Sequence, residues 1–196
     1  MINLRNHSRY EHPFPLTYFR DVWTCYGELL GNLPDDRFYI ANEHGGHCGP
    51  ARTSLSLVPR RLRAVPNQSF WLGVRDALHS ADVRQQLEEM FGVSLAHPFA
   101  CLVRDKKGHY IDVHPDWDMK VLTVQFYLPP DPSLRALGTS VHDKNKALVR
   151  TLDFLPNTGY AFVRSDSSFH SLRELPDGAV RDTLMLTYNR EPHDEY

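Results

Sequence analysis

Several kinds of segment are missing from this sequence, and each absence excludes a class of protein. The chain has only three cysteines, Cys25, Cys48 and Cys101, and their odd number and wide spacing differ from the disulfide framework of a small secreted domain. No stretch approaches the roughly 20 consecutive apolar residues of a membrane-spanning helix, and the first residues lack the apolar core of a signal peptide. We therefore expect a cytoplasmic protein with reduced thiols and no membrane contact.

A concentration of charge of one sign is also missing. The formal net charge is -2, and the densest basic run is the short cluster of Arg60, Arg61 and Arg63. Nucleic-acid-binding proteins gather many Lys and Arg residues on one face, whereas a cluster this short is typical of a solvated surface. The sequence therefore predicts no nucleic-acid partner.

Internal repeats, low-complexity tracts and a Pro/Gly-rich linker are absent as well. A chain of 196 residues with 41% apolar content can bury a core without disulfides or structural metals. We expect a single domain over residues 1–196. No pattern in the sequence indicates an oligomeric state.

The front of the chain carries helical signals. Apolar residues over 16–30 recur three and four positions apart, which predicts one face of a helix. A second helical stretch begins near Asn67. A third is predicted over 81–91, because Ser80 can cap its N-terminus and Gly92 can end it.

From Pro98 onward the hydrophobic period changes to two. Short strand-like runs cover 99–104, 110–114, 120–128, 150–154, 159–164, 169–175 and 181–188. Residues 106–108 read as a hairpin turn and 156–159 as a second tight turn. Seven or eight strands behind a helical front predict a mainly β protein with N-terminal helices (α+β), built as a jelly roll or a β-barrel.

The phase of two strands adds to this prediction. In 122–128 the even positions are apolar and the odd positions are polar or amphipathic. In the last strand Leu184 and Leu186 share one face, and Arg181 and Thr183 share the other. A polar strand face usually meets solvent, but two such faces could equally line the mouth of a barrel, where ligands bind.

Only some of the eleven histidines are placed like metal ligands. His114 and Asp116 lie where a predicted strand ends, so that both side chains can converge on one point, and His170 is the natural third ligand. Two histidines and one carboxylate on one face of an octahedral ion suit non-haem Fe(II), with three positions left open. Zinc with a bound water fits the same ligands.

Arg181 favours iron over zinc. It follows His170 by eleven residues, and Thr183 lies on the same strand face. A guanidinium fork pairs with a carboxylate through two parallel hydrogen bonds, to which a hydroxyl can add a third. A hydrolytic zinc enzyme has no need of that clamp. An oxygenase that binds 2-oxoglutarate needs it, because the 2-oxo acid end chelates the iron and the far carboxylate must be held.

The ordered motif resembles that of the Fe(II)/2-oxoglutarate-dependent dioxygenase superfamily, nearest to its prolyl-hydroxylase-like branch. The matching positions are His114, Asp116, His170, Arg181 and Thr183. Residues 122–128 resemble the family strand that often carries a tyrosine touching the far carboxylate, which here is Tyr127. Residues 137–139 and 155–162 look like the glycine turn and the segment before the distal histidine. The resemblance covers about 98–190. It implies that 98–190 form a jelly-roll catalytic core and that 1–97 form a helical support and a substrate-side segment.

The resemblance implies a double-stranded β-helix (jelly roll, cupin-like) core with Fe(II) and 2-oxoglutarate as cofactors. Iron would be held by His114, Asp116 and His170, and 2-oxoglutarate by residues that include Arg181. O2 and 2-oxoglutarate would give succinate and CO2. Because family halogenases carry Gly or Ala at the position of Asp116, hydroxylation is favoured over halogenation.

We expect a small or carrier-bound metabolite as the substrate. One alternative is a protein or peptide hydroxylase of the prolyl type. Another is a metal-binding, cupin-like module without catalysis, although such a module has no reason to place an anion-binding fork at Arg181.

The glycine-rich loop before residue 52 holds further candidates. His44, His47 and Cys48 could bind zinc, but a fourth ligand at metal-site spacing is missing. Loops of this kind more often contact substrates. We therefore take His44, His47 and Arg52 as candidate substrate residues.

Three more residues lie close to these motifs in sequence. Trp117 directly follows the ligand pair, and its ring could either wall the substrate pocket or cover the barrel edge. His109 lies beside a predicted turn and His142 lies in a polar segment. We expect both histidines to be solvated.

Overall fold

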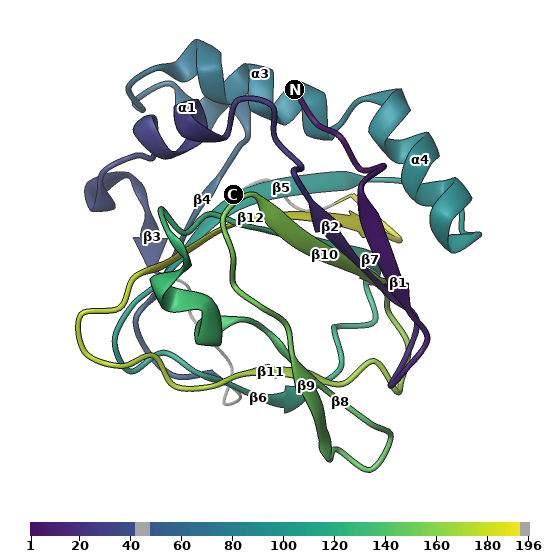
Figure 1. Ribbon diagram of the computed structural model, residues 1–196. Helices are drawn as coiled ribbons and strands as arrows, with labels where there is room; N and C mark the ends of the chain where they lie inside the picture. The colour runs from purple at the N-terminus through teal and green to yellow at the C-terminus, as the bar shows by residue number, and fades with distance from the viewer. Residues whose placement is uncertain (42–47, 193–196) are drawn as a thin grey trace.

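Two antiparallel β-sheets face each other, and helices lie against the outer face of the larger sheet (Figure 1). The computed structural model describes residues 1–41 and 48–192. Among these residues, the larger sheet is ordered β1 (His7–Tyr10), β2 (Leu16–Arg20), β10 (Thr158–Val163), β7 (Lys120–Tyr127), β12 (Arg181–Asn189), β5 (Pro98–Asp105), β4 (Arg52–Ser56) and β3 (Ile40–Ala41). The smaller sheet is ordered β6 (Ile111–His114), β11 (His170–Leu172), β8 (Ser140–His142) and β9 (Leu148–Thr151).

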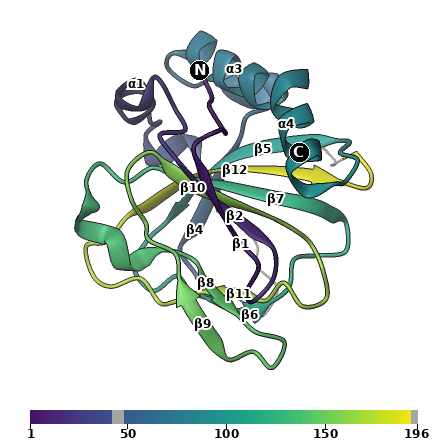
Figure 2. The ribbon, with the colours of Figure 1, turned by 45° about the vertical axis from the view of Figure 1, so that its right-hand side comes forward.

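The helices form a third layer, which stays on one side of the larger sheet when the molecule is turned (Figure 2). They are α1 (Tyr26–Gly31), α2 (Pro59–Leu62), α3 (Gln68–Leu78) and α4 (Ala81–Phe91), with 3-10 turns at Asp36–Phe38 and Pro132–Leu137. Trp71 and Leu87 from the helices share one apolar core with Phe126 and Leu184 from the sheet. No helix in the described ranges is long and apolar enough to cross a membrane.

The two longer helices occur where the sequence predicts them. The Ser80 side chain accepts a hydrogen bond from the backbone N–H of Val83 at 3.2 Å, so it caps α4 as expected. Gly92 ends α4 in the left-handed conformation, with φ +66, which glycine adopts without a steric cost. Asn67 directly precedes α3. These local signals are confirmed.

The predicted helix over 16–30 is wrong for its first half. Residues Leu16–Arg20 form β2, and only Tyr26–Gly31 is helical. Leu16 packs in the core between the sheets, whereas Phe19 packs in the core under the helices. Because both faces of β2 are buried, its apolar residues do not alternate and they imitate a helical period. The front of the chain therefore supplies strands to the larger sheet as well as helices.

The strands predicted after residue 98 are largely present, with two corrections. The turn near Gly108 exists, with φ +79 at that glycine, but it is not a hairpin turn because β5 and β6 belong to different sheets. The strand expected over 150–154 lies earlier, at Leu148–Thr151. Strand β8 was not predicted, because three buried residues between polar segments give no clear period.

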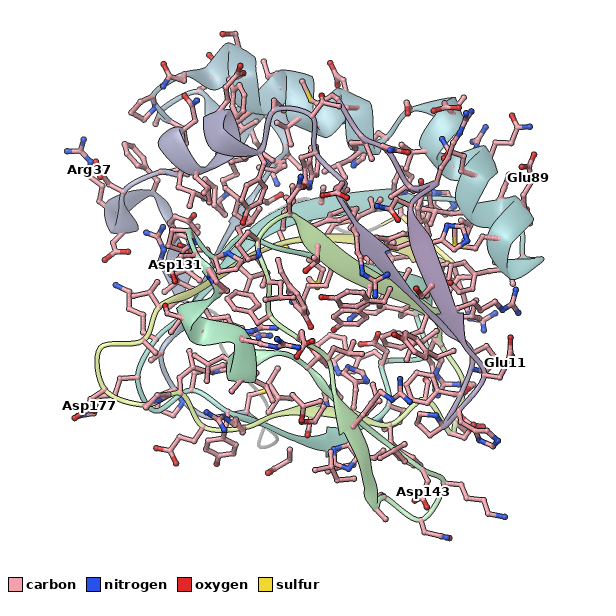
Figure 3. All side chains as sticks on the ribbon, viewed as in Figure 1. Glu11, Arg37, Glu89, Asp131, Asp143 and Asp177 are labelled. Carbon is pink, nitrogen blue, oxygen red and sulfur yellow. The ribbon has the colours of Figure 1, made fainter. Side chains whose placement is uncertain are left out.

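Strand β7 shows how the sheet separates apolar from polar side chains. Its even residues, including Val124 and Phe126, join the core under the helices. Thr123 and Gln125 point the other way and line a cavity. Side chains of both sheets fill the space between them (Figure 3). The polar face of β7 therefore lines a cavity between the sheets, which was one of the two readings that its sequence allowed.

Candidate metal centre and adjoining cavity

Three potential metal ligands converge at the ends of strands β6 and β11 in the smaller sheet. His114 ends β6, Asp116 follows two residues later, and His170 begins β11. Cross-strand pairing places His170 opposite His114, with ring centroids 4.5 Å apart. One ligand atom of each residue lies within 4.8 Å of the others, and within the described residues this is the one group of its kind. We call His114, Asp116 and His170 the metal triad.

Backbone carbonyls orient both imidazoles of the metal triad. His114 Nδ1 lies 2.8 Å from the carbonyl oxygen of Asp112, and His170 Nδ1 lies 3.1 Å from that of Ser168. Because a carbonyl can only accept, each Nδ1 carries a proton, and Nε2 keeps its lone pair for a metal. His170 Nε2 lies 3.9 Å from Asp116 Oδ1.

Asp116 is a buried carboxylate held from two sides. Its Oδ2 accepts from the Thr123 hydroxyl at 2.5 Å, and its Oδ1 lies 2.6 Å from Lys120 Nζ. Burial acts to raise the pKa of Asp116, but Lys120 and His170 outweigh it and hold that pKa well below its usual range. Burial lowers the pKa of His170 to about 4. At neutral pH these two residues thus carry the protonation states that metal binding requires.

A cavity of about 90 Å³ opens between the sheets at the metal triad. The triad and Arg181 both line it. Thr123 and Gln125, neighbours on one face of β7, connect them: Thr123 bonds to Asp116, and Gln125 lies 3.4 Å from Arg181. Residues two apart on a strand are separated by about 7 Å. A short molecule could therefore reach from the metal triad to the Arg181 guanidinium.

Arg181 is 1% exposed at the start of β12, and each of its three guanidinium nitrogens contacts the protein. Nε donates to the Leu137 carbonyl at 2.9 Å, and Nη1 donates to Asp105 Oδ2 at 3.0 Å. Nη2 makes two longer contacts of 3.4 Å, to Gln125 and Thr139. The sequence suggested that the Arg181 guanidinium offers two parallel hydrogen bonds to a carboxylate. In the structure Nε and Nη1 bond to Leu137 and Asp105, and chiefly Nη2 faces the polar cavity wall.

Thr183 and Tyr127 lie behind that wall. Thr183 Oγ1 accepts from Gln125 Nε2 at 3.1 Å, and the Tyr127 hydroxyl accepts from the Thr139 N–H at 3.0 Å. Both residues are fully buried. They therefore position Gln125 and Thr139, which line the cavity.

Sequence reasoning named no role for several residues that line the cavity, among them Gln125, Thr139 and Tyr160. Tyr160 donates its hydroxyl to Gln125 Oε1 at 2.8 Å, and Thr139 lies 3.4 Å from the same oxygen. The strand phase of β7 already placed Gln125 beside Thr123. Tyr160 could not be found in this way, because its position depends on the pairing of β10 with β7, which sets it opposite Gln125.

The candidate substrate residues have different positions. Arg52 begins β4 and lines the cavity, and it binds the Asp105 carboxylate through Nε at 2.6 Å and Nη2 at 3.0 Å. Trp117 is 78% exposed beside Asp116. His44 and His47 lie outside the described residues, and so does the possible zinc site that they would form with Cys48.

Two histidines expected in solvent are buried, so this prediction is wrong. His109 is 0% exposed, and its Nδ1 lies 3.0 Å from the Gly49 carbonyl oxygen. His142 is 6% exposed in β8, with Nε2 2.8 Å from Ser171 Oγ. Both lie in polar sequence surroundings, but segments distant in sequence cover them.

Comparison with known proteins gives a likeness in structure. No protein-family profile and no curated protein matches this sequence. A Pseudomonas putida prolyl-4-hydroxylase superposes with a TM-score of 0.65 at 12% identity, over 90% of this chain and 92% of that one. A Trichoplax adhaerens prolyl hydroxylase, in complex with a hypoxia inducible factor peptide fragment, gives 0.65 at 13% identity, over 89% and 83%.

A third similar structure comes from Burkholderia pseudomallei. It is an oxidoreductase of the 2OG-Fe(II) oxygenase family, with a TM-score of 0.60 at 16% identity over 90% of this chain and 86% of that one. The chain thus has the fold of these prolyl hydroxylases and this oxygenase. The fold agrees with the family resemblance of the sequence motif.

Proposed function

We propose that this chain is an Fe(II)- and 2-oxoglutarate-dependent oxygenase that hydroxylates its substrate and releases succinate and CO2. The observation that carries the proposal is the shared cavity, in which the metal triad and the buried Arg181 line one polar space. Two imidazoles and one carboxylate are the facial donor set of non-haem Fe(II). The buried Arg181 guanidinium beyond them can hold the far carboxylate of 2-oxoglutarate. A hydrolytic zinc enzyme or a simple metal-binding module does not need such a group.

The side chains have separate tasks in this proposal. His114, Asp116 and His170 hold the iron, which when bound supplies the activation of O2. Lys120 and Thr123 orient the Asp116 carboxylate. Because Asp116 occupies a coordination position that a halide would need, hydroxylation is the favoured outcome.

The spacing of two residues along the cavity wall supports 2-oxoglutarate as the co-substrate. Thr123 marks the metal end and Gln125 marks the Arg181 end, with about 7 Å between residues two apart on a strand. A five-carbon dicarboxylate spans such a distance, with its 2-oxo acid end at the metal and its far carboxylate at Arg181. Gln125 and Thr139 would surround that carboxylate, with Thr183 and Tyr127 holding them in place.

The domain organisation forms part of the proposal. We infer that the facing sheets constitute a double-stranded β-helix (jelly roll, cupin-like) and that 98–190 form the catalytic core. Residues 1–97 support this core with helices and with edge strands of the larger sheet. They also supply Arg52 to the cavity.

For the substrate, we propose a small or carrier-bound metabolite, whose reactive carbon approaches from the side on which His114 is partly exposed. A peptide is the alternative. It is favoured by the 78% exposure of Trp117, beside Asp116, which offers an apolar contact outside the cavity. A screen of both substrate classes, scored by succinate formation, separates these candidates.

Paired binding measurements on two variants test the proposed roles. His170→Ala removes one of three metal ligands and should abolish stoichiometric Fe(II) binding. Arg181→Ala should leave Fe(II) binding intact and weaken 2-oxoglutarate binding by about tenfold to a hundredfold, because hydrogen bonds to charged groups contribute about 1.5–3 kcal/mol. Iron is measured after anaerobic desalting, and 2-oxoglutarate by calorimetry with Mn(II)-loaded protein.

The matched control is His79→Ala, which removes a partly buried histidine at the end of α3, outside the metal triad and the cavity. It should bind both ligands like the unaltered chain. Equal loss of metal and 2-oxoglutarate in Arg181→Ala, or full iron binding in His170→Ala, would contradict the assigned roles.

A further inference from the structure

A buried carboxylate lies between two arginines behind the cavity. Asp105, the last residue of β5, is 0% exposed. In the larger sheet it is the cross-strand partner of Arg181 on β12 and of Arg52 on β4. The three residues therefore form a row across adjacent strands, and both arginines reach the cavity wall.

The two arginines hold Asp105 unequally. Arg52 binds both carboxylate oxygens, through Nε at 2.6 Å and Nη2 at 3.0 Å. Arg181 makes one bond, from Nη1 to Oδ2 at 3.0 Å. A bidentate guanidinium–carboxylate pair is the strongest of these arrangements, so Asp105 is chiefly the partner of Arg52.

The row carries a positive charge that its own carboxylate does not neutralise. Burial acts to raise the pKa of Asp105, but Arg52 and Arg181 outweigh it, so that this pKa is lowered and Asp105 is ionised at neutral pH. His109 lies 3.5 Å from Asp105, and burial lowers its pKa, so that it is neutral. Two guanidinium groups and one carboxylate leave one positive charge at the cavity.

We propose that Arg52 is a positioning residue for co-substrate binding, acting through Asp105. Because Arg52 binds both oxygens of Asp105, this carboxylate cannot form a bidentate ion pair with Arg181, which would neutralise the charge of Arg181. Arg181 then retains its charge and its Nη2 for the far carboxylate of 2-oxoglutarate. This inference rests on the proposed function and assigns Arg52 to the co-substrate, where the sequence suggested the substrate.

Three variants test the inference by calorimetric titration of 2-oxoglutarate into Mn(II)-loaded protein. Arg52→Gln frees Asp105 to neutralise Arg181, and the dissociation constant for 2-oxoglutarate should rise by about tenfold or more, as expected for loss of a buried net charge. The double variant Arg52→Gln with Asp105→Asn removes the competing carboxylate as well. It should recover most of the lost affinity. Arg52→Lys keeps the charge but cannot bind both oxygens of Asp105 through a planar fork, so its dissociation constant should lie between those of the unaltered chain and Arg52→Gln.

Recovery in the double variant distinguishes this role from others. If Arg52 touched the ligand directly, the second substitution would not restore binding. A double variant as weak as Arg52→Gln, or an Arg52→Gln variant with unchanged affinity, overturns the inference while leaving the proposed function standing. If Arg52→Gln does not fold, an Arg52→Lys variant that binds 2-oxoglutarate as tightly as the unaltered chain overturns it instead. Failure of the unaltered chain to bind 2-oxoglutarate contradicts the proposed function itself.

Discussion

Single buried polar residues determine the chemistry of this protein. Asp116 and Asp105 are both almost inaccessible, and each keeps its charge because cations and hydrogen-bond donors contact it. His170, by contrast, is kept uncharged by burial. Since an unpaired charge is costly to bury, the protonation state of each of these residues depends on its immediate neighbours.

His79 gives a residue-scale prediction outside the site. Its Nε2 is buried and has no hydrogen-bond partner among the described residues, and burial lowers its pKa to about 4. In the unfolded chain its pKa is about 6.5. The unfolded state therefore binds more protons between these values, and stability should fall as the pH drops below about 6.5.

Replacing His79 should make the protein less sensitive to acid. In His79→Gln, the loss of unfolding free energy between about pH 6.5 and pH 4 should be smaller by about 1–2 kcal/mol, since a pKa unit corresponds to 1.36 kcal/mol and partial exposure reduces the effect. Urea unfolding at several pH values measures it. His7→Gln, an exposed histidine in β1, is the control, and an equal pH slope in all three proteins would refute the prediction.

At the scale of elements, local signals were predictable and sheet membership was not. Helix α4 was found because Ser80 and Gly92 act within a few residues of the helix ends. Strand β2 was misread because one of its faces is buried under the helices and the other between the sheets. Its strand partners β1 and β10 were not foreseen or are distant in sequence.

The candidate site divides in the same way. The sequence predicted that the metal triad and Arg181 lie near one another, because these residue types in that order form a motif, and the structure brings them to one cavity. Their roles stay predictions. Gln125 and Tyr160 become neighbours only through the pairing of β7 with β10. The bond between Arg52 and Asp105 likewise depends on the pairing of β4 with β5, and no periodicity in the sequence encodes that register.

The cap of α4 gives the prediction at this scale. Ser80→Ala removes the hydrogen bond to the Val83 N–H and should lower the free energy of unfolding by about 1 kcal/mol. Urea denaturation measures the change. Ser94→Ala, an exposed serine after the helix, should change stability by less than about 0.5 kcal/mol. Equal effects of the two substitutions would show that the cap does not contribute.

At the scale of the whole molecule, the two sheets contribute different halves of the site. His114 and His170 belong to the smaller sheet. Arg181 and Gln125 belong to the larger one, which the helices support from outside (Figure 1). A metal and a dicarboxylate bound together would therefore join the sheets, and the proposed activity depends on how the sheets face each other.

The central claim is that iron and 2-oxoglutarate occupy one cavity, in contact with each other. Its most direct test is the absorption spectrum of the protein with Fe(II) and 2-oxoglutarate under anaerobic conditions. Chelation of iron by the 2-oxo acid should produce a visible metal-to-ligand charge-transfer band that appears only when both are present and is lost in His170→Ala. A folded, iron-loaded protein that gives no such band with saturating 2-oxoglutarate would contradict the account.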